Sequence, residues 1–256
     1  MKKLLSLGLT LLLAAGCTSS PADNQSAYEL YSAAVKRSSE AKKIAAKMET
    51  KLSMTVEEET MDMNMTMDLA LDQSDSTQPK FTMETTTESL GTALTVNTYY
   101  LDNNFYMDLF GQKLKTEIDF SEVLDQTASL TEQANIFSEE DFKEAAITKE
   151  GDTTVLTLEP SEALQKKLSQ QALEQAEVEN SELSFGDTQI QIKLNKAGDF
   201  EEIFFEVPVS ITVENEKMEM SYATHMYYTG FDDQVTLNFP DDLADYQSAD
   251  LDLELE

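Results

Sequence analysis

The chain has 256 residues, and its 49 acidic and 18 basic side chains give a formal net charge of −31 at neutral pH. Such a charge argues against binding to nucleic acid, whose phosphates it would repel, and against electrostatic docking on anionic lipid headgroups. With 41% hydrophobic residues the chain is not a disordered acidic tail, and it is long enough to bury one sizeable core.

The N-terminus has the pattern of a bacterial lipoprotein leader. Met1 to Lys3 is basic, and Leu4 to Ala15 is an apolar stretch too short to span a bilayer as a mature helix. It ends at Leu13-Ala14-Ala15-Gly16-Cys17, which resembles a lipobox, although leucine is commoner where Ala14 stands. An ordinary signal peptide is the alternative, but Cys17 is the only cysteine and lies where lipidation would use it.

Several expectations follow from this leader. Residues 1–16 are a signal peptide that is removed, Cys17 carries acyl chains such as palmitate, and residues 17–25 form a short tether. The lipid anchor would hold the protein on the extracytoplasmic face of the cell membrane, as part of the cell envelope. A lone, acylated cysteine is also excluded as a nucleophile, a disulfide partner or a metal ligand.

A helix is predicted to begin after Ser26, because Ser26 and Glu29 have the spacing of a capping box. Small and apolar residues follow at helical spacing and predict that the helix continues to Met48. This stripe consists of Ala27, Leu30, Tyr31, Ala34, Ala41, Ala45 and Met48.

Strict alternation makes Ser53 to Leu71 the clearest strand region of the chain. From Met61 onward, Met or Leu occupies every second position, and polar or small residues lie between them, as in a strand with one buried face. A two-residue turn at Glu58-Glu59 would give the cross-strand pairs Val56–Met61 and Met54–Met63, all on one face.

The same pattern occurs again from Ser210 to Ser221, which matches Ser53 to Asn64. A turn at Asn215-Glu216 would pair Val213 with Met218 and Ile211 with Met220. We therefore expect two similar hairpins that form matching parts of one sheet.

The other segments predict a sheet with a few helices. An antiparallel meander is expected from Lys51 to Ile118, in which Tyr99 to Met107 form two strands around an asparagine turn. The middle of the chain predicts helices that begin near Asp119, Ser138 and Ser161, and a hairpin around Gly151.

Alternation returns in the last third, from Ile190 to Tyr228, with Pro208 placing its strand near an edge or a bulge. A short closing strand, Val235 to Phe239, is expected to end at Pro240. Residues 26–240 then form a single domain, and residues 241–256 form a loose acidic tail. The fold class is α+β, with a curved antiparallel sheet over a few helices.

The residue inventory contains no recognisable catalytic or cofactor site. The only histidine, His225, lies in an alternating strand, so a multi-histidine zinc site is excluded. There is no Gly-x-Ser-x-Gly motif and no glycine-rich phosphate loop, and Asp232-Asp233 and Asp241-Asp242 lack the pattern of a calcium loop. We expect a binding protein without cofactor or metal, not an enzyme.

The methionines give the positive indication of function. Methionine is flexible and polarizable, and surfaces that accept varied apolar partners use it often. The apolar faces would then line a cavity for acyl chains or another hydrophobic ligand; the alternative, a dry core between sheet and helices, is the commoner role of such stripes. The candidate cavity residues are Met54, Val56, Met61, Met63, Met65, Met67, Phe81, Met83, Leu94, Val96, Phe205, Ile211, Val213, Met218, Met220 and Tyr222.

The chain resembles LolA-like lipoproteins, and in particular a family of Gram-positive lipoproteins of uncharacterised function within that superfamily. The resemblance rests on the lipobox, on Tyr99 to Met107 with Gly111 to Leu114, on the repeated Met hairpins, and on Val213 to Met220 followed by Val235 to Pro240. It implies a half-open antiparallel β-barrel, a half-barrel, whose concave side is closed by helices. Relatives with that fold carry lipoproteins or glycolipids by enclosing acyl chains.

Two functions follow as hypotheses. The first is a membrane-anchored binder of lipid or another hydrophobic ligand. The classical LolA-like carrier is soluble, whereas the lipobox predicts an anchor for this chain, so a tethered binder fits better than a carrier that crosses the envelope. The second is a structural or protein-interaction lipoprotein of the cell envelope, with a dry core and an acidic surface that meets a basic partner.

Overall fold

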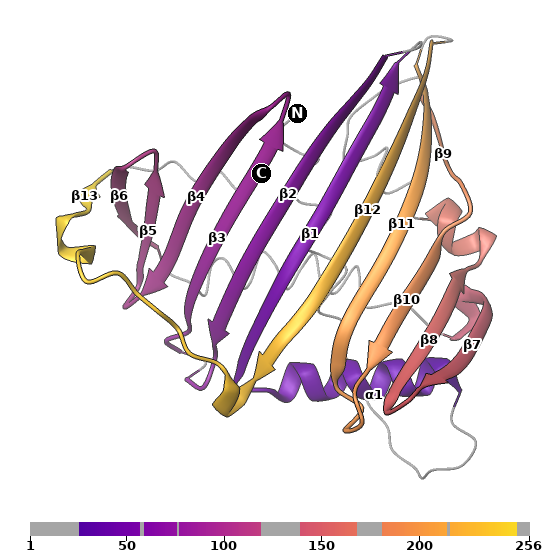
Figure 1. The fold of residues 1–256 in the computed structure, drawn as a ribbon, viewed down its shortest axis with the longest axis horizontal. Coiled ribbons are helices and arrows are strands. Elements are labelled where there is room, and N and C mark those ends of the chain that lie inside the picture. The colour runs from indigo at the N-terminus through magenta and orange to yellow at the C-terminus, as the bar shows by residue number, and fades with distance from the viewer. Residues whose placement is uncertain are drawn as a thin grey trace.

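The computed structural model describes residues 26–56, 59–75, 77–118, 139–167, 181–213 and 216–249. Most of these residues form one 13-stranded sheet, which is curved and does not close on itself (Figure 1). The expected curved antiparallel sheet is therefore confirmed. The fold is predominantly β, so the predicted α+β class overestimated the helical content.

The helix α1 (Ala27–Glu40) begins as the capping box predicts. The backbone N–H of Glu29 donates to Ser26 Oγ at 3.1 Å, and that of Ser26 donates to Glu29 Oε2 at 2.8 Å. The helix ends at Glu40, because Ala41 adopts extended backbone angles (φ −64°, ψ 136°). The predicted continuation to Met48 is wrong, since a strand already begins at Lys43.

The reason for this early end is visible in the residues that follow. From Ile44 to Val56 the chain alternates between one set that is mostly apolar and another that is mostly charged or polar, which suits a strand. Neighbouring strands pair with this segment on both sides and satisfy its backbone hydrogen bonds. Pairing of this kind overrides the helical spacing of Ala41, Ala45 and Met48.

The first half of the sheet is a meander in which each strand pairs antiparallel with the next. The meander predicted from Lys51 to Ile118 is therefore confirmed, but it begins at Lys43. Its strands are β1 (Lys43–Val56), β2 (Glu59–Asp72), β3 (Lys80–Ser89), β4 (Thr92–Leu101), β5 (Asn104–Leu109) and β6 (Gln112–Glu117).

The remaining strands complete the sheet in the order β13-β6-β5-β4-β3-β2-β1-β12-β11-β10-β8-β7, with β9 paired to β11. The short helical turns η2 (Glu139–Asp141), η3 (Asp232–Gln234) and η4 (Leu243–Asp245) lie between strands. The strand bounds are β7 (Phe142–Glu150), β8 (Thr153–Pro160), β9 (Ser181–Phe185), β10 (Gln189–Leu194), β11 (Phe200–Val213), β12 (Glu216–Phe231) and β13 (Gln247–Ser248).

The two repeated hairpins, β1–β2 and β11–β12, lie side by side in the middle of the sheet, because β1 pairs with β12. Their registers differ from the predicted ones by two residues: Met54 faces Met61, and Ile211 faces Met218. A shift of two residues keeps every side chain on its face. The predicted faces are therefore right although the predicted pairs are wrong.

Other predictions for the second half have mixed outcomes. The hairpin around Gly151 is confirmed as β7–β8, and a helical segment follows Ser161 over residues 162–167. The predicted helices near Asp119 and Ser138 begin outside the described residues. Within the described part, Phe142 opens a strand instead of continuing a helix.

Pro208 lies where β11 changes its outer partner from β10 to β9, so β11 is not an edge strand. The backbone N–H of Gly186 donates to the Pro208 carbonyl at 2.8 Å. In a strand, the nitrogen and the carbonyl of one residue point to the same side. The Pro208 nitrogen therefore faces the break between the two partner strands, where no ladder N–H is needed.

The C-terminal part of the described chain differs from its prediction. Val235 to Phe239 form no strand, although Val235 is buried. The expected tail is ordered up to Ala249: β13 pairs parallel with β6, and Tyr246 is buried. The Tyr246 ring packs edge-on against Tyr106 at 5.4 Å between centroids. The packing of Tyr246 thus orders a segment whose acidic composition predicted a loose tail.

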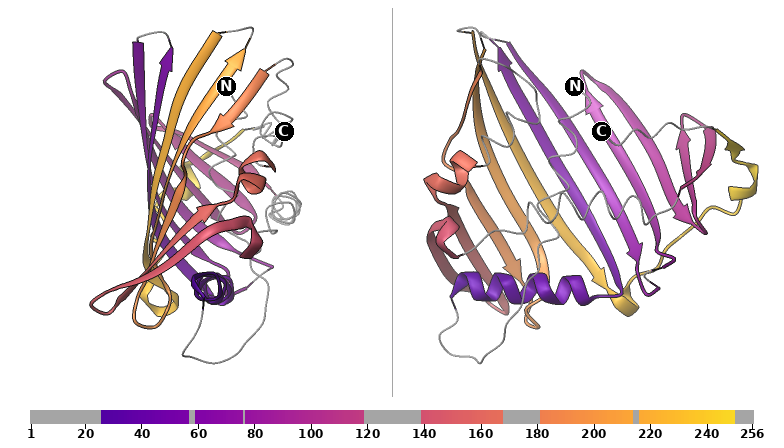
Figure 2. Two further views of the ribbon diagram at one scale, coloured as in Figure 1. Left: turned by 90° about the vertical axis from the view of Figure 1, so that its right-hand side faces the viewer. Right: turned by 180° about the vertical axis from the view of Figure 1, so that it is seen from behind.

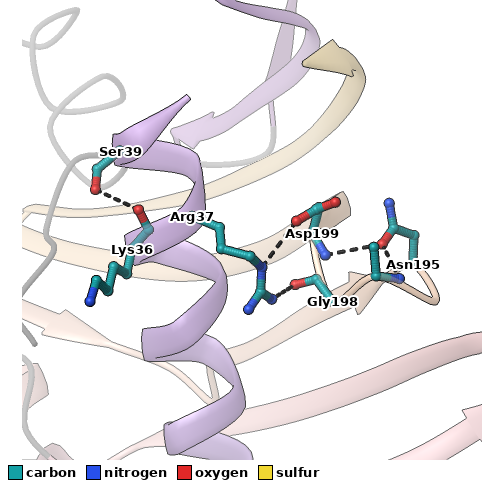
Figure 3. Close-up of polar contacts among 7 residues, drawn as sticks. Lys36, Arg37, Ser39, Asn195, Gly198 and Asp199 are labelled. Carbon is teal, nitrogen blue, oxygen red and sulfur yellow. Dashed lines mark hydrogen bonds and ion pairs between the residues drawn. The ribbon is translucent and has the colours of Figure 1, made fainter. Parts of the chain in front are cut away.

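The helix α1 crosses one end of the sheet, over β7, β8 and β11 (Figure 2). It is held there by Arg37, which reaches the turn between β10 and β11 (Figure 3). Arg37 Nε donates to Asp199 Oδ1 at 3.0 Å, and a terminal guanidinium nitrogen donates to the Gly198 carbonyl. Gly198 has φ +85°, a backbone conformation that residues with a Cβ rarely adopt, so glycine suits this turn.

The core lies between α1 and the sheet. Its buried members include Ala34 and Val35 of the helix, Met48 of β1, Leu156 of β8 and Ile192 of β10. Next to this core, on the same sheet face, lie the buried side chains Thr50 and Thr224, whose hydroxyl oxygens are 3.0 Å apart. Each hydroxyl is thus the hydrogen-bond partner of the other.

Replacing Arg37 by Met should lower the free energy of unfolding by about 1–2 kcal/mol, since two charge-assisted hydrogen bonds are lost at a partly exposed site. Urea unfolding measures the change. The control is Lys36→Met on the next residue, whose ion pair with Glu40 is exposed and should contribute no more than about 0.5 kcal/mol. Equal effects of the two substitutions would contradict the assigned role of Arg37.

Replacing Thr50 alone by Val should cost about 1–2 kcal/mol of stability, because the Thr224 hydroxyl is then buried without its partner. The double variant Thr50→Val/Thr224→Val should lie closer to the wild type, since no polar group is left unpaired. A double-mutant cycle of denaturant midpoints tests this. Strictly additive losses would show that the two hydroxyls do not interact.

Candidate functional site: one apolar face of the sheet

The register places all of the candidate cavity positions on one face of the sheet, although they come from β1, β2, β3, β4, β11 and β12. Directly opposed residues of antiparallel strands share a face, so the pairs can be followed across the sheet. One such row is Phe205–Thr224–Thr50–Met65–Thr87–Leu94, and another is Val209–Met220–Met54–Met61. We call this side of the sheet the apolar face.

The end of the apolar face next to α1 is a closed core. Met48, Ile203 and Met226 are buried there. An aromatic cluster joins the helix to the sheet: Tyr31 lies 6.2 Å from Phe200 between ring centroids, and Phe200 stacks on Tyr228 at 5.3 Å. Burial raises the pKa of Tyr31 to about 12, and it also raises the pKa of Tyr228. Both phenols are therefore neutral at physiological pH.

The other end of the apolar face is only partly covered. Met54, Met63, Met218 and Met220 are half-buried, and Met61 is 46% exposed, whereas Met48 on the same face is 4% exposed. The exposure therefore increases along the strands with distance from α1. Among the described residues, Met61, close to the end of the β1–β2 hairpin, is the most exposed methionine.

Sequence reasoning missed some residues of this face. Leu52 on β1 and Val207 and Val209 on β11 lie in the same rows as the candidate residues. Leu52 was missed because the predicted helix reached Met48 and hid the start of β1. The two valines alternate with Phe205 and Ile211, so the period-two pattern was sufficient to include them.

The opposite face of the sheet is polar. His225 Nδ1 lies 3.1 Å from Glu202 Oε1, and Lys193 Nζ lies 2.6 Å from Glu202 Oε2. Burial would raise the pKa of the Glu202 carboxyl, but its hydrogen bonds with Lys193 and His225 outweigh this and lower the pKa overall. Glu202 therefore remains an anion in an ion-paired network on the surface of the sheet.

The C-terminal segment packs on this same polar face, away from the apolar one. Phe239 lies 6.4 Å from Tyr99 between ring centroids, and Asp242 pairs with Lys113. In the described part of the chain, no cluster of three or more His, Cys, Asp or Glu side chains could hold a metal ion. No helix within the same residues has the length and apolarity that crossing a membrane requires. Cys17 lies outside the described residues.

Three solved structures illustrate what the fold is similar to. LprF from Mycobacterium bovis is 10% identical, with a TM-score of 0.43, over 84% of this chain and 96% of that one. A DUF1329 family protein from Desulfovibrio piger is 10% identical, with a TM-score of 0.24, over 84% and 96%. A domain assigned as an outer membrane lipoprotein-sorting protein from Vibrio parahaemolyticus is 9% identical, with a TM-score of 0.20, over 75% and 87%.

One of the three is by its name a lipoprotein-sorting domain. Their TM-scores are below 0.5, so the role of the apolar face is argued from this chain alone. None of the curated proteins compared matches the chain. A family model described as "Family of unknown function (DUF6612)" matches residues 26–247, which is most of the chain. The chain therefore belongs to the family of unknown function DUF6612.

Proposed function

We propose that the protein binds a lipid or another hydrophobic ligand on the apolar face, without catalysing a reaction. The observation that carries this proposal is the gradient of exposure among methionines of one face. Met48 is buried under α1, whereas Met61 is almost half exposed. A face that served only as a dry core would be covered along its whole length.

The chemistry of the accessible part suits a ligand without strong directional groups. Methionine side chains on β1, β2 and β12 can change rotamer at low cost and fill irregular gaps, so they can adapt to acyl chains of different lengths. Such a site gains free energy from buried apolar area, at roughly 25 cal/mol for each Å² removed from water. Hydrogen bonds would contribute little there.

The N-terminal pattern supports a tethered version of this binder. The lipobox-like stretch ends at Cys17, and α1 begins at Ala27, so a short tether would join the anchor to the helix that closes one end of the apolar face. We therefore propose a signal peptide in residues 1–16 and acyl chains on Cys17. The protein would act as a lipid-anchored lipoprotein on the extracytoplasmic side of the cell membrane.

Replacing Met63 by Glu should reduce the uptake of a fluorescent fatty acid by about tenfold, because a carboxylate on the apolar face must be desolvated when the ligand binds. The chain from Thr18 onward is suitable for this titration, since it contains every described element and lacks the anchor.

The control is Asn64→Glu, the same charge change one residue later on the opposite face of β2, where Asn64 is exposed. This variant should bind the fatty acid as the wild type does. If both variants remain folded by circular dichroism and bind equally well, the apolar face is not the binding site. A wild type that takes up no fatty acid would instead indicate a dry core and an interaction protein.

A further inference from the structure

Two large hydrophobic side chains project into solvent from hairpin turns that lie at the same end of the strands, which forms one edge of the sheet. Leu90 is 83% exposed in the turn between β3 and β4, and Phe110 is 78% exposed in the turn between β5 and β6. They are the most exposed large hydrophobic side chains in the described part of the chain. Isolated surface apolar residues are common, but two on neighbouring hairpin ends form a pattern.

The two turns have the same backbone conformation, which makes their residue choice unusual. Both central residues of each turn have positive φ: 51° and 77° at Leu90-Gly91, and 54° and 77° at Phe110-Gly111. Asn, Asp and Gly favour the first position of such a turn, and bulky residues there are disfavoured. Neither Leu90 nor Phe110 gains burial within the described chain that would offset this preference.

The opposite edge of the sheet provides the internal comparison. Asp102-Asn103, between β4 and β5, adopts the same positive-φ conformation (51° and 60°) with the residues that favour it. The turns Gly151-Asp152 and Asn195 to Asp199 at that edge are also polar. Among these turns, a large apolar residue at a positive-φ position therefore occurs at one edge only.

This edge, which we call the tip edge, holds the ends of the hairpins β1–β2, β3–β4, β5–β6 and β11–β12. In Figure 1 these ends follow one slanted line along the side of the sheet away from α1. The accessible end of the apolar face lies at the same edge, because Met61 is close to the β1–β2 end. Leu90 and Phe110 therefore lie at the same edge as the exposed Met61, and in the strand order both are on the β3 side of it.

We propose that the tip edge contacts a lipid bilayer whose headgroups carry no net charge, with Leu90 and Phe110 inserted into its interfacial layer. Leucine and phenylalanine are side chains that interfacial membrane segments bury in this way. A protein partner fits less well, since a specific interface buries roughly 1,200–2,000 Å² of continuous surface, and these two side chains stand on separate hairpin ends.

The charge of the chain selects the kind of bilayer. Residues 88–93 contain no Lys or Arg, and Lys113, next to the second turn, is paired with Asp242. With a net charge of −31, the chain is repelled by anionic headgroups. Binding should therefore be strongest on zwitterionic lipid. Added salt should strengthen binding to anionic vesicles, because it screens the repulsion.

The proposed anchor restricts the orientation of this contact. Residues 17–25 span at most about 30 Å when extended, whereas the 14 residues of β1 are roughly 46 Å long. The helix α1 and the tip edge lie at opposite ends of β1. If the strands stood perpendicular to the membrane, α1 would be beyond the reach of the tether, so the strands must tilt away from the membrane normal. The contact itself does not depend on the proposed function, but a role in passing lipid to the apolar face does.

The absence of tryptophan from the chain allows a site-specific test. In the chain from Thr18 onward, Leu90→Trp and Phe110→Trp each introduce a single fluorophore at the tip edge, and Asn103→Trp places one at the opposite edge as the control. On addition of phosphatidylcholine vesicles, the emission of the two tip variants should shift to shorter wavelength and become protected from acrylamide. The emission of Asn103→Trp should not change.

Cosedimentation with the same vesicles gives the second measurement. The double variant Leu90→Asp/Phe110→Asp should bind about tenfold more weakly than the wild type. This double variant should still take up fatty acid from solution. Met63→Glu should show the opposite pattern, with reduced fatty-acid uptake and unchanged vesicle binding. The ligand proposal and the membrane proposal can therefore fail separately. Equal spectral shifts at all three tryptophans, no shift at the tip edge, or tighter binding to vesicles with phosphatidylglycerol would overturn the membrane contact.

Discussion

The fold depends on the need to cover one apolar face of a very long antiparallel sheet. Strict alternation in β1, β2, β11 and β12 puts the apolar side chains of four adjacent strands on the same side, and antiparallel pairing aligns them into rows. Such rows must be covered by protein or by another apolar material. In the described part of the chain, α1 covers these rows at one end only, and this asymmetry separates a core from a candidate site.

The position of α1 follows from contacts that are distant in sequence. Its small residues allow close packing on the sheet, and the aromatic rings of Tyr31, Phe200 and Tyr228 fill the space between helix and strands. Arg37 joins the helix to the turn at Gly198 and Asp199. These interactions hold the helix at the end of the strands that is remote from the tip edge, so the exposed Met61 and the exposed turn residues Leu90 and Phe110 lie together at the tip edge.

Periodicity predicted the faces of the sheet well, because an error of two residues in a hairpin register leaves every side chain on its side. It failed where one pattern fits two structures: Ala41, Ala45 and Met48 suit a helix as well as the approach to a strand. The order of residues 241–249 depends on Tyr246 meeting Tyr106, which lies 140 positions earlier in the chain. The contact of Arg37 with Asp199 is equally non-local. That the exposed residues Leu90 and Phe110 lie at one edge could not be predicted either, because it depends on the order and direction of the strands.

Native mass spectrometry of the chain from Thr18 onward, purified from cells without detergent, tests the central claim most directly. The account predicts a discrete adduct of lipid mass that organic extraction removes. A clean mass without adduct, unchanged after incubation with lipid vesicles, would contradict it and would show that the apolar face is covered by the protein itself.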